Sequence, residues 1–134
     1  MTEIAIELRA GKALDVGHIL TSWVRSNAKT AWAKEAGRCY STEHWRAAKS
    51  ILERGAVVLV AHLADDPDAI IGWAVFEPGV LHYVYVRAGL RKQGIARRLL
   101  SEWGGSIFTH KPTVPLRLPE HWQFNPYLIH RAPE

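Results

Sequence analysis

The sequence predicts one mixed α/β (α+β) domain over residues 1–134, with a central sheet flanked by helices. Apolar residues alternate with polar ones near the N-terminus, which indicates a half-buried strand. Two later segments repeat apolar residues at helical spacing, and three runs rich in β-branched residues lie between residues 56 and 86. With 134 residues and 48% hydrophobic content, the chain is long enough to bury one core.

The N-terminal half contains one strand and two helices. The apolar spacing predicts a strand over Glu3–Arg9, a helix over Lys12–Asn27, a loop or short helix over Ala28–Tyr40, and a second helix ending at Arg54. Ser41 or Thr42 is the expected N-cap of that second helix. Its expected buried face consists of Trp45, Ala48, Ile51 and Leu52.

Strands dominate the middle of the chain. The pattern predicts strands over Ala56–Leu63, Ile70–Phe76 and Val80–Val86, joined by turns at Asp65–Asp68 and Glu77–Gly79. A helix over Gly94–Trp103 follows, with Ala96, Leu99, Leu100 and Trp103 on its apolar face. The expected element order is therefore β-α-α-β-β-β-α, followed by a tail.

The tail is rich in proline, since five of the seven prolines follow Trp103. Val114–Leu118 and Tyr127–His130 are candidate strands, and Pro115 restricts the first to a sheet edge or a bulge. Between them, Glu120–Phe124 leaves room for about one helical turn.

Charge and composition narrow the classes of function. The net charge is +4, and five basic residues occur in twelve positions without an acidic one: Arg87, Arg91, Lys92, Arg97 and Arg98. This cluster suits an anionic cofactor, or else a nucleic acid, which we favour less. The chain has no apolar run of about 18 residues and no visible signal peptide, so we expect no membrane association. With the single Cys39, these features predict a cytoplasmic protein, and the His and Cys spacing predicts no metal site.

The segment that follows the third predicted strand of this group has the features of a phosphate-binding loop. A turn leads from Val86 to the run Arg91–Ala96, which opens the last predicted helix. Main-chain N–H groups at a helix N-terminus have no partner within the helix, and the helix dipole favours negative charge there. Gly94 allows the main chain to approach a ligand closely.

This segment resembles the acyl-CoA-binding motif of the GNAT N-acetyltransferase superfamily, Q/R-x-x-G-x-G/A after a strand valine. Arg91, Gly94 and Ala96 match the motif, and Val86 stands at the expected distance before it. The resemblance implies a mostly antiparallel sheet and acetyl-CoA as cofactor. The implied cofactor-binding residues are Val84 and Val86 on the strand, and Arg91, Lys92, Gln93, Gly94, Ile95, Ala96 and Arg97 in the loop and helix start. An ordinary strand-to-helix turn with a solvated basic face is the alternative.

The resemblance also directs attention to acid–base residues. Members of the superfamily often carry a glutamate six residues before the motif valine, where this chain has Val80. His82, on the same strand face, is the candidate general base, because its ordinary pKa lies near neutrality. Tyr127 is the candidate acid for the leaving thiolate. Structural packing is the alternative role of both side chains.

The acceptor site is expected between the first two helices. Trp23, Trp32 and Tyr40 are the candidate substrate-binding residues, although large aromatic side chains more often belong to a core. The implied function is transfer of an acetyl or other acyl group to a primary amine of a small molecule or protein. A non-catalytic CoA-binding module and a nucleic-acid-directed relative are the alternatives, and a homodimer stays open.

Overall fold

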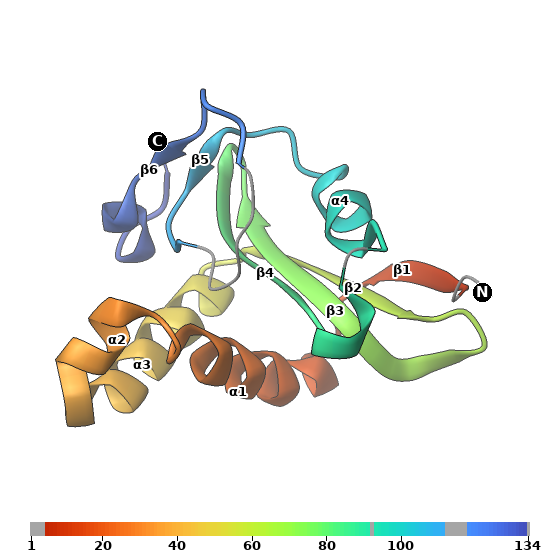
Figure 1. Cartoon of the computed structure of the whole chain (residues 1–134), viewed down its shortest axis with the longest axis horizontal. Helices are drawn as coiled ribbons and strands as arrows, with labels where there is room; N and C mark the ends of the chain where they lie inside the picture. The colour runs from red at the N-terminus through yellow and green to blue at the C-terminus, as the bar shows by residue number, and fades with distance from the viewer. Residues whose placement is uncertain (1–4, 92, 112–117, 134) are drawn as a thin grey trace.

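A computed structural model describes residues 5–91, 93–111 and 118–133. Its framework is one six-stranded sheet in which the strands lie side by side in chain order (Figure 1). The strands are β1 (Ile6–Ala10), β2 (Val57–Leu63), β3 (Asp66–Glu77), β4 (Val80–Val86), β5 (Ile107–Phe108) and β6 (Gln123–Phe124). The first four pair antiparallel, whereas β5 and β6 pair parallel to their neighbours. The expected mixed, mostly antiparallel sheet is confirmed.

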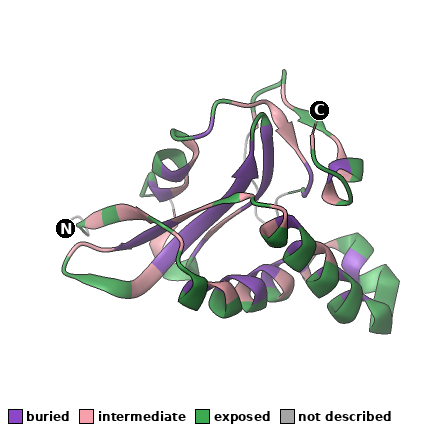
Figure 2. Ribbon diagram, turned by 180° about the vertical axis from the view of Figure 1, so that it is seen from behind, coloured by how far each residue is buried: buried purple, intermediate pink, exposed green. Residues whose placement is uncertain are grey.

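Helices cover both faces of the sheet (Figure 1). The α-helices are α1 (Val16–Asn27), α2 (Ala31–Ala36), α3 (Tyr40–Glu53) and α4 (Ile95–Leu100), and short 3₁₀ turns include η3 (Ala88–Leu90) and η4 (Pro126–Ile129). Helices α1 and α3 pack on one face through Trp23, Ala48 and Ile51. Helix α4 packs on the other face through Ile95 and Leu99. Burial is therefore concentrated in the central strands and in the inward stripes of these helices (Figure 2).

The predicted start of the second helix is wrong by two or three residues. Cys39 is the N-cap of α3, so that Ser41 and Thr42 lie within the first helical turn. The buried face also differs, because Trp45 is 38% exposed whereas His44 is buried. One residue is about 100° of helical rotation, which turns Trp45 out of the stripe that packs on the sheet. Ala48 and Ile51 are fully buried, as predicted.

Several other boundaries differ from the sequence pattern. β3 begins at Asp66, four residues earlier than expected, and α4 ends at Leu100 instead of Trp103. The predicted strand Tyr127–His130 is wrong: Pro126 begins a 3₁₀ turn there, and the Asn125 side chain accepts a hydrogen bond from the Tyr127 amide. The predicted strand Val114–Leu118 lies outside the described residues, apart from Leu118. Among the described residues, no helix has the length and apolar character needed to cross a bilayer.

Strands β4 and β5 diverge, which opens the sheet between them. Among the described residues they pair only at Val80 and Leu81, and the last main-chain hydrogen bond joins the Thr109 amide to the Leu81 carbonyl at 3.0 Å. Gly105 precedes β5 and crosses directly over the turn between β3 and β4. A Cβ at position 105 would overlap the main chain of Gly79, so a close approach of two main chains fixes the closed end of the gap.

Candidate functional site

The free edge of β4 lines the gap between β4 and β5. The Arg87 amide donates to the Ile71 carbonyl on β3 at 2.9 Å, whereas the Val86 carbonyl accepts from the Arg91 side chain at 3.1 Å. Because main-chain polar groups alternate in direction along a strand, those of Val84 and Val86 face away from β3. Both residues lie beyond the last contact with β5. The edge therefore offers main-chain donors and acceptors to an extended ligand.

The loop after β4 ends in a left-handed residue that starts α4. Gly94 is the N-cap, with φ of 79°, and an added Cβ would meet no described atom within 4 Å. The first intrahelical hydrogen bond runs from the Arg98 amide to the Gly94 carbonyl at 3.0 Å. The amides of Ile95, Ala96 and Arg97 thus precede the helical ladder. Within the described part of the chain, open space and amides without a partner thus occur together at Gly94.

The side chains of the loop differ in how they are held. Ile95 is buried against the sheet and anchors the start of the helix, while Gln93 and Arg97 are exposed. Arg91 is half-buried, and its Nε bonds the Val86 carbonyl. Arg98 is exposed and bonds the Ile6 carbonyl on β1 at 3.3 Å. Lys92 lies outside the described residues. The roles of these residues in cofactor binding stay predictions.

Replacing Arg91 by Ala is expected to weaken acetyl-CoA binding about tenfold, because one charge-assisted contact to a phosphate is worth about 1.5–3 kcal/mol. Arg98→Ala is expected to change the affinity less than about twofold, because its guanidinium is held against β1. Isothermal titration calorimetry of both variants measures the difference. Equal losses would show that a diffuse positive field, and not a shaped loop, holds the cofactor.

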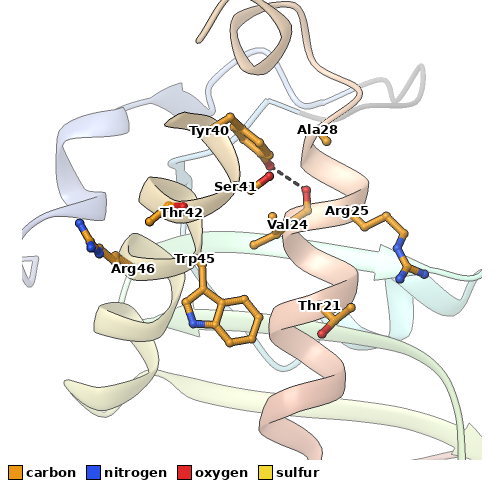
Figure 3. A pocket seen from close by; sticks show the side chains of 9 residues that line it. All are labelled: Thr21, Val24, Arg25, Ala28, Tyr40, Ser41, Thr42, Trp45 and Arg46. Atoms are coloured by element: carbon orange, nitrogen blue, oxygen red, sulfur yellow. Dashed lines mark hydrogen bonds between the residues drawn. The ribbon is translucent and has the colours of Figure 1, made fainter. Parts of the chain in front are cut away.

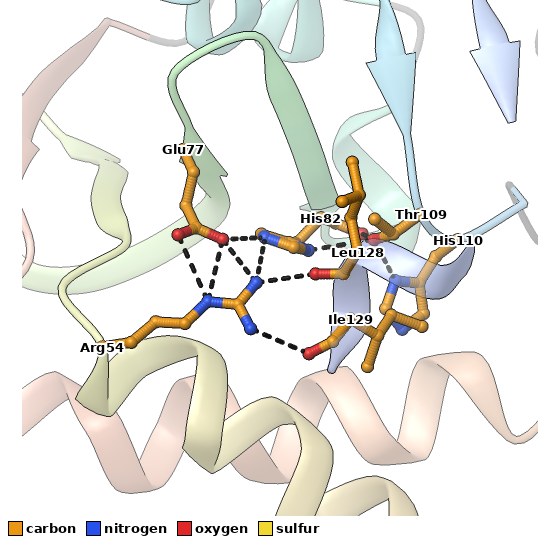
Figure 4. A network of polar contacts seen from close by, with 7 residues as sticks. All are labelled: Arg54, Glu77, His82, Thr109, His110, Leu128 and Ile129. Carbon is orange, nitrogen blue, oxygen red and sulfur yellow. Dashed lines mark hydrogen bonds and ion pairs between the residues drawn. The ribbon is translucent and has the colours of Figure 1, made fainter. Parts of the chain in front are cut away.

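A buried polar network lies at the closed end of the gap and joins the end of α3 to β3, β4, the segment after β5 and η4 (Figure 4). The Arg54 guanidinium donates to the Glu77 carboxylate, with the shortest contact at 2.6 Å. Glu77 Oε1 also lies 2.6 Å from His82 Nε2, and His82 Nδ1 lies 3.0 Å from Thr109 Oγ1. Thr109 Oγ1 in turn lies 2.9 Å from Nδ1 of His110.

The network also holds the C-terminal segment. Arg54 donates to the carbonyls of Leu128 at 2.7 Å and Ile129 at 3.0 Å. These residues belong to η4, which packs against α3. One guanidinium therefore joins the end of α3, the end of β3 and the tail.

Burial and hydrogen bonding set the protonation of this network. Burial opposes ionisation of Glu77, but hydrogen bonds from Arg54 and His82 outweigh it and lower the pKa of Glu77. Burial lowers the pKa of His82, and contact with Glu77 offsets this in part. Glu77 is thus an anion and His82 a neutral imidazole near pH 7.

This arrangement limits what His82 can do. Its side chain is fully buried, and both ring nitrogens have partners within the network. Because both nitrogens are occupied, neither has a lone pair or hydrogen left for an amine. The base role of His82 stays a prediction, and the geometry restricts it to proton transfer through Thr109. Tyr127, the predicted acid, is 75% exposed on η4 and does not join the network.

The predicted substrate-binding aromatics gather around His44. The Trp32 ring lies 5.7 Å from Tyr40 and 5.8 Å from His44, and the Trp23 ring lies 6.1 Å from His44. Trp32 is 48% exposed, whereas Trp23 is fully buried and Tyr40 nearly so. Burial raises the pKa of Tyr40 to about 12 and lowers the pKa of His44 to about 4. The cluster extends from the surface at Trp32 to His110, whose ring lies 5.0 Å from His44.

A shallow groove of about 550 Å³ lies between the outer faces of α1 and α3 (Figure 3). It is lined by Thr21, Val24, Arg25, Ala28, Tyr40, Ser41, Thr42, Trp45 and Arg46. The Tyr40 hydroxyl crosses its end and donates to the Val24 carbonyl at 2.8 Å. The exposed face of Trp45 therefore lies where the acceptor site was expected.

Sequence reasoning missed four members of the buried network: Arg54, Glu77, Thr109 and His110. In the sequence, Arg54 stands at the end of a predicted helix and Glu77 in a predicted turn, and charged residues at such positions are usually exposed to solvent. The available signal was the polar pair Thr109-His110 directly after an apolar dipeptide, since buried polar residues need partners.

Comparison with known proteins finds the same fold. No family model matches the sequence, and no curated protein matches it. Among solved structures, YjaB from Escherichia coli has a TM-score of 0.55 at 20% identity, over 74% of this chain and 64% of YjaB. A GCN5-related N-acetyltransferase from Rhodopseudomonas palustris has a TM-score of 0.52 at 18% identity, over 76% of this chain and 65% of that protein. YhbS, a GNAT family N-acetyltransferase from E. coli solved with CoA, has a TM-score of 0.51 at 20% identity, over 76% of this chain and 56% of YhbS.

The chain thus spans less than two thirds of the length of each of these three structures. The protein has the fold of the GNAT N-acetyltransferases.

Proposed function

We propose that the protein is an acetyl-CoA-dependent N-acetyltransferase that acts on a primary amine of a small molecule or protein. The divergence of β4 from β5 is the observation that supports this most. It exposes the polar edge of β4 directly before the Arg91–Ala96 loop. The fold likeness to YhbS, which was solved with CoA, supports the same cofactor.

The described residues fit this cofactor. The edge at Val84 and Val86 would bond the extended pantetheine chain, whose amides need main-chain partners. The amides from Gln93 to Ala96 would hold the pyrophosphate, because position 94 borders open space and the helix start supplies unpaired N–H groups. Arg91 and Arg97 would add charge. The cofactor supplies the activated acetyl thioester.

The chain's own part in the reaction is to orient groups and to move protons. An N–H group near Val84 would donate to the carbonyl oxygen on which negative charge develops. A primary amine is largely protonated at neutral pH, so it must lose a proton before it is a nucleophile. The buried network beside β4 ends in Glu77, an anion that stabilises a transferred proton. The gap would thus supply an N–H donor to the developing oxyanion and, in Glu77, a negative charge that stabilises the transferred proton.

Acetyl-CoA is expected to bind the wild-type protein and to raise its melting temperature by mass action. Gly94→Val is expected to weaken binding about 10- to 100-fold, because a side chain would fill the space next to the unpaired amides. Calorimetry and thermal unfolding measure the two effects. Val at this position also strains the main chain, since φ is positive there.

Gly79→Ala is the control that separates the effect of main-chain strain from the effect of contact with the ligand in Gly94→Val. Gly79 has φ of 76°, close to that of Gly94, and an added Cβ also meets open space. Both variants are expected to lose stability, but only Gly94→Val loses affinity. Absence of CoA binding by the wild-type chain would refute the proposed function. Binding without acetyl transfer to a broad amine panel would instead favour a non-catalytic CoA-binding module.

A further inference from the structure

Hydrogen positions in the buried network follow from its heavy atoms. Ionised Glu77 has no hydrogen to give, so His82 Nε2 donates to it. The neutral His82 ring then has a bare Nδ1, which accepts the hydroxyl hydrogen of Thr109 at 3.0 Å. The main-chain carbonyl of His82 lies farther from that hydroxyl, at 3.5 Å. The single hydrogen of Thr109 is thus directed to His82.

The same reasoning fixes the tautomer of His110. The Thr109 oxygen has already given its hydrogen, so at 2.9 Å it accepts one from His110 Nδ1. His110 Nε2 consequently carries a lone pair. That nitrogen is buried and has no partner among the described residues.

The surroundings of this lone pair suit an amine. His110 directly follows Thr109, whose amide makes the last hydrogen bond between β4 and β5. Aromatic rings surround it: the Trp23 ring at 5.4 Å, the His44 ring at 5.0 Å and the Tyr83 ring at 5.6 Å. Aromatic faces and a bare acceptor both attract N–H groups that carry positive charge.

A second bare acceptor lies next to the same rings. The Tyr40 hydroxyl donates to the Val24 carbonyl, so it accepts from the Asn27 amide nitrogen. That nitrogen also faces His44 Nε2 at 3.5 Å. Asn27 Oδ1 therefore points elsewhere, and it is buried without a partner among the described residues. With the Trp23 Nε1–H group, which is also buried without a partner among the described residues, these two acceptors leave hydrogen-bonding capacity in the aromatic cluster for a bound polar group.

We propose that His110 is the proton acceptor for the amine, and that Thr109, His82 and Glu77 are positioning residues that carry the proton away. This inference rests on the proposed function and names the base for it. The ammonium group transfers one proton to His110 Nε2 and becomes a neutral amine that keeps its lone pair. The lone pair then forms the new C–N bond, the C–S bond breaks with its electron pair on sulfur, and a second proton passes from nitrogen to that sulfur, which leaves a neutral amide and the CoA thiol.

The network returns His110 to its starting charge. His110 Nδ1 gives its hydrogen to the Thr109 oxygen, and the Thr109 hydroxyl gives its own to His82 Nδ1. His82 becomes an imidazolium whose Nε2–H already faces the Glu77 anion at 2.6 Å. The same pairs of atoms thus stay hydrogen-bonded after the transfer. The two hydrogen bonds of the Thr109 hydroxyl have exchanged donor and acceptor.

The tautomers are tested on the free wild-type protein by ¹⁵N NMR of the histidine side chains. The expected spectrum at pH 7 has the His82 hydrogen on Nε2 and the His110 hydrogen on Nδ1. Thr109→Val removes the hydroxyl and is expected to abolish the preference of His110 for Nδ1. A wild-type spectrum with the His110 hydrogen on Nε2 would overturn the proposal. This readout requires neither acetyl-CoA nor turnover.

Kinetics test the role in transfer. His110→Gln is expected to lower kcat about 10²- to 10³-fold at pH 7, with acetyl-CoA affinity unchanged and partial recovery at high pH. Thr109→Val is expected to lower kcat about tenfold, and Thr109→Ser to restore it. His121→Gln, at an exposed site, is the matched control. The pH dependence of kcat also depends on the charge of the groups that face His110, which are His44 on α3 and His82 and Tyr83 on β4.

The outcomes separate this inference from the proposed function. Full activity of Thr109→Val with an unchanged pH profile would overturn the proton relay while leaving acetyl transfer intact. Equal activity of Thr109→Val and Thr109→Ser would do the same. If His110→Gln does not fold, the comparison of Thr109→Val with Thr109→Ser and the wild-type NMR spectrum still test the proposal. A wild-type protein that binds acetyl-CoA and acetylates no amine would refute the enzymatic function and the base role together.

Discussion

Arg54→Met is expected to lower the free energy of unfolding by about 3–5 kcal/mol, the loss typical of removing one partner from a buried ion pair. The variant leaves the Glu77 carboxylate buried with only His82 as a partner. It also removes the donors to the carbonyls of Leu128 and Ile129, so the tail loses its polar anchor. Urea denaturation followed by circular dichroism measures the change.

Arg46→Met is the matched control. Arg46 pairs with Glu43 on the same helix, but both side chains are more than half exposed. Exposed pairs of this kind contribute little, so the expected change is below about 0.5 kcal/mol. A loss below about 1 kcal/mol for Arg54→Met would mean that solvent reaches Glu77 easily and that the network is not buried in solution.

The second large effect is on the pH dependence of stability. Burial lowers the pKa of His44 from 6.5 to about 4, so the unfolded chain binds a proton at His44 before the folded protein does. The stabilisation is complete above pH 6.5 and is lost as the pH falls towards 4. For this shift it amounts to about 3 kcal/mol. Burial also lowers the pKa of His82 and His110, which adds to the loss in the same direction.

Urea denaturation at intervals between pH 7 and pH 4 tests this expectation. His44→Phe keeps an aromatic ring in the cluster and removes one titrating group, so it is expected to reduce the pH dependence over this range while His82 and His110 retain theirs. His121→Gln, which removes an exposed histidine, is expected to leave the slope unchanged. A wild-type protein of constant stability from pH 7 to 4.5 would contradict the burial of these rings.

The sequence predicted those parts of the fold that depend on local pattern. A run of β-branched and aromatic residues marked β4, which is largely buried within the sheet, and helical spacing marked α1 and α4, which each bury one face against that sheet. Boundaries were less predictable where tertiary contacts override propensity. The Asp66–Asp68 segment reads as a turn, yet it extends β3, where the Pro67 carbonyl accepts hydrogen bonds from Arg9.

The buried network was not predictable in the same way. Arg54, Glu77, His82 and Thr109 come from a helix end, two strands and the segment after β5, and no spacing along the chain relates them. His82 was found because the resemblance pointed to its strand. Its partners required three-dimensional placement, since a charged residue at a helix end or turn is ordinarily solvated.

The contact between Gly79 and Gly105 has a mechanical consequence. The two main chains touch there, so the start of β5 is held against the turn that precedes β4. β6 pairs with β5, and Arg54 hydrogen-bonds η4, which follows β6 in the chain. A ligand that widened the gap between β4 and β5 would displace β6 together with β5, and it would therefore strain the hydrogen bonds that hold the tail.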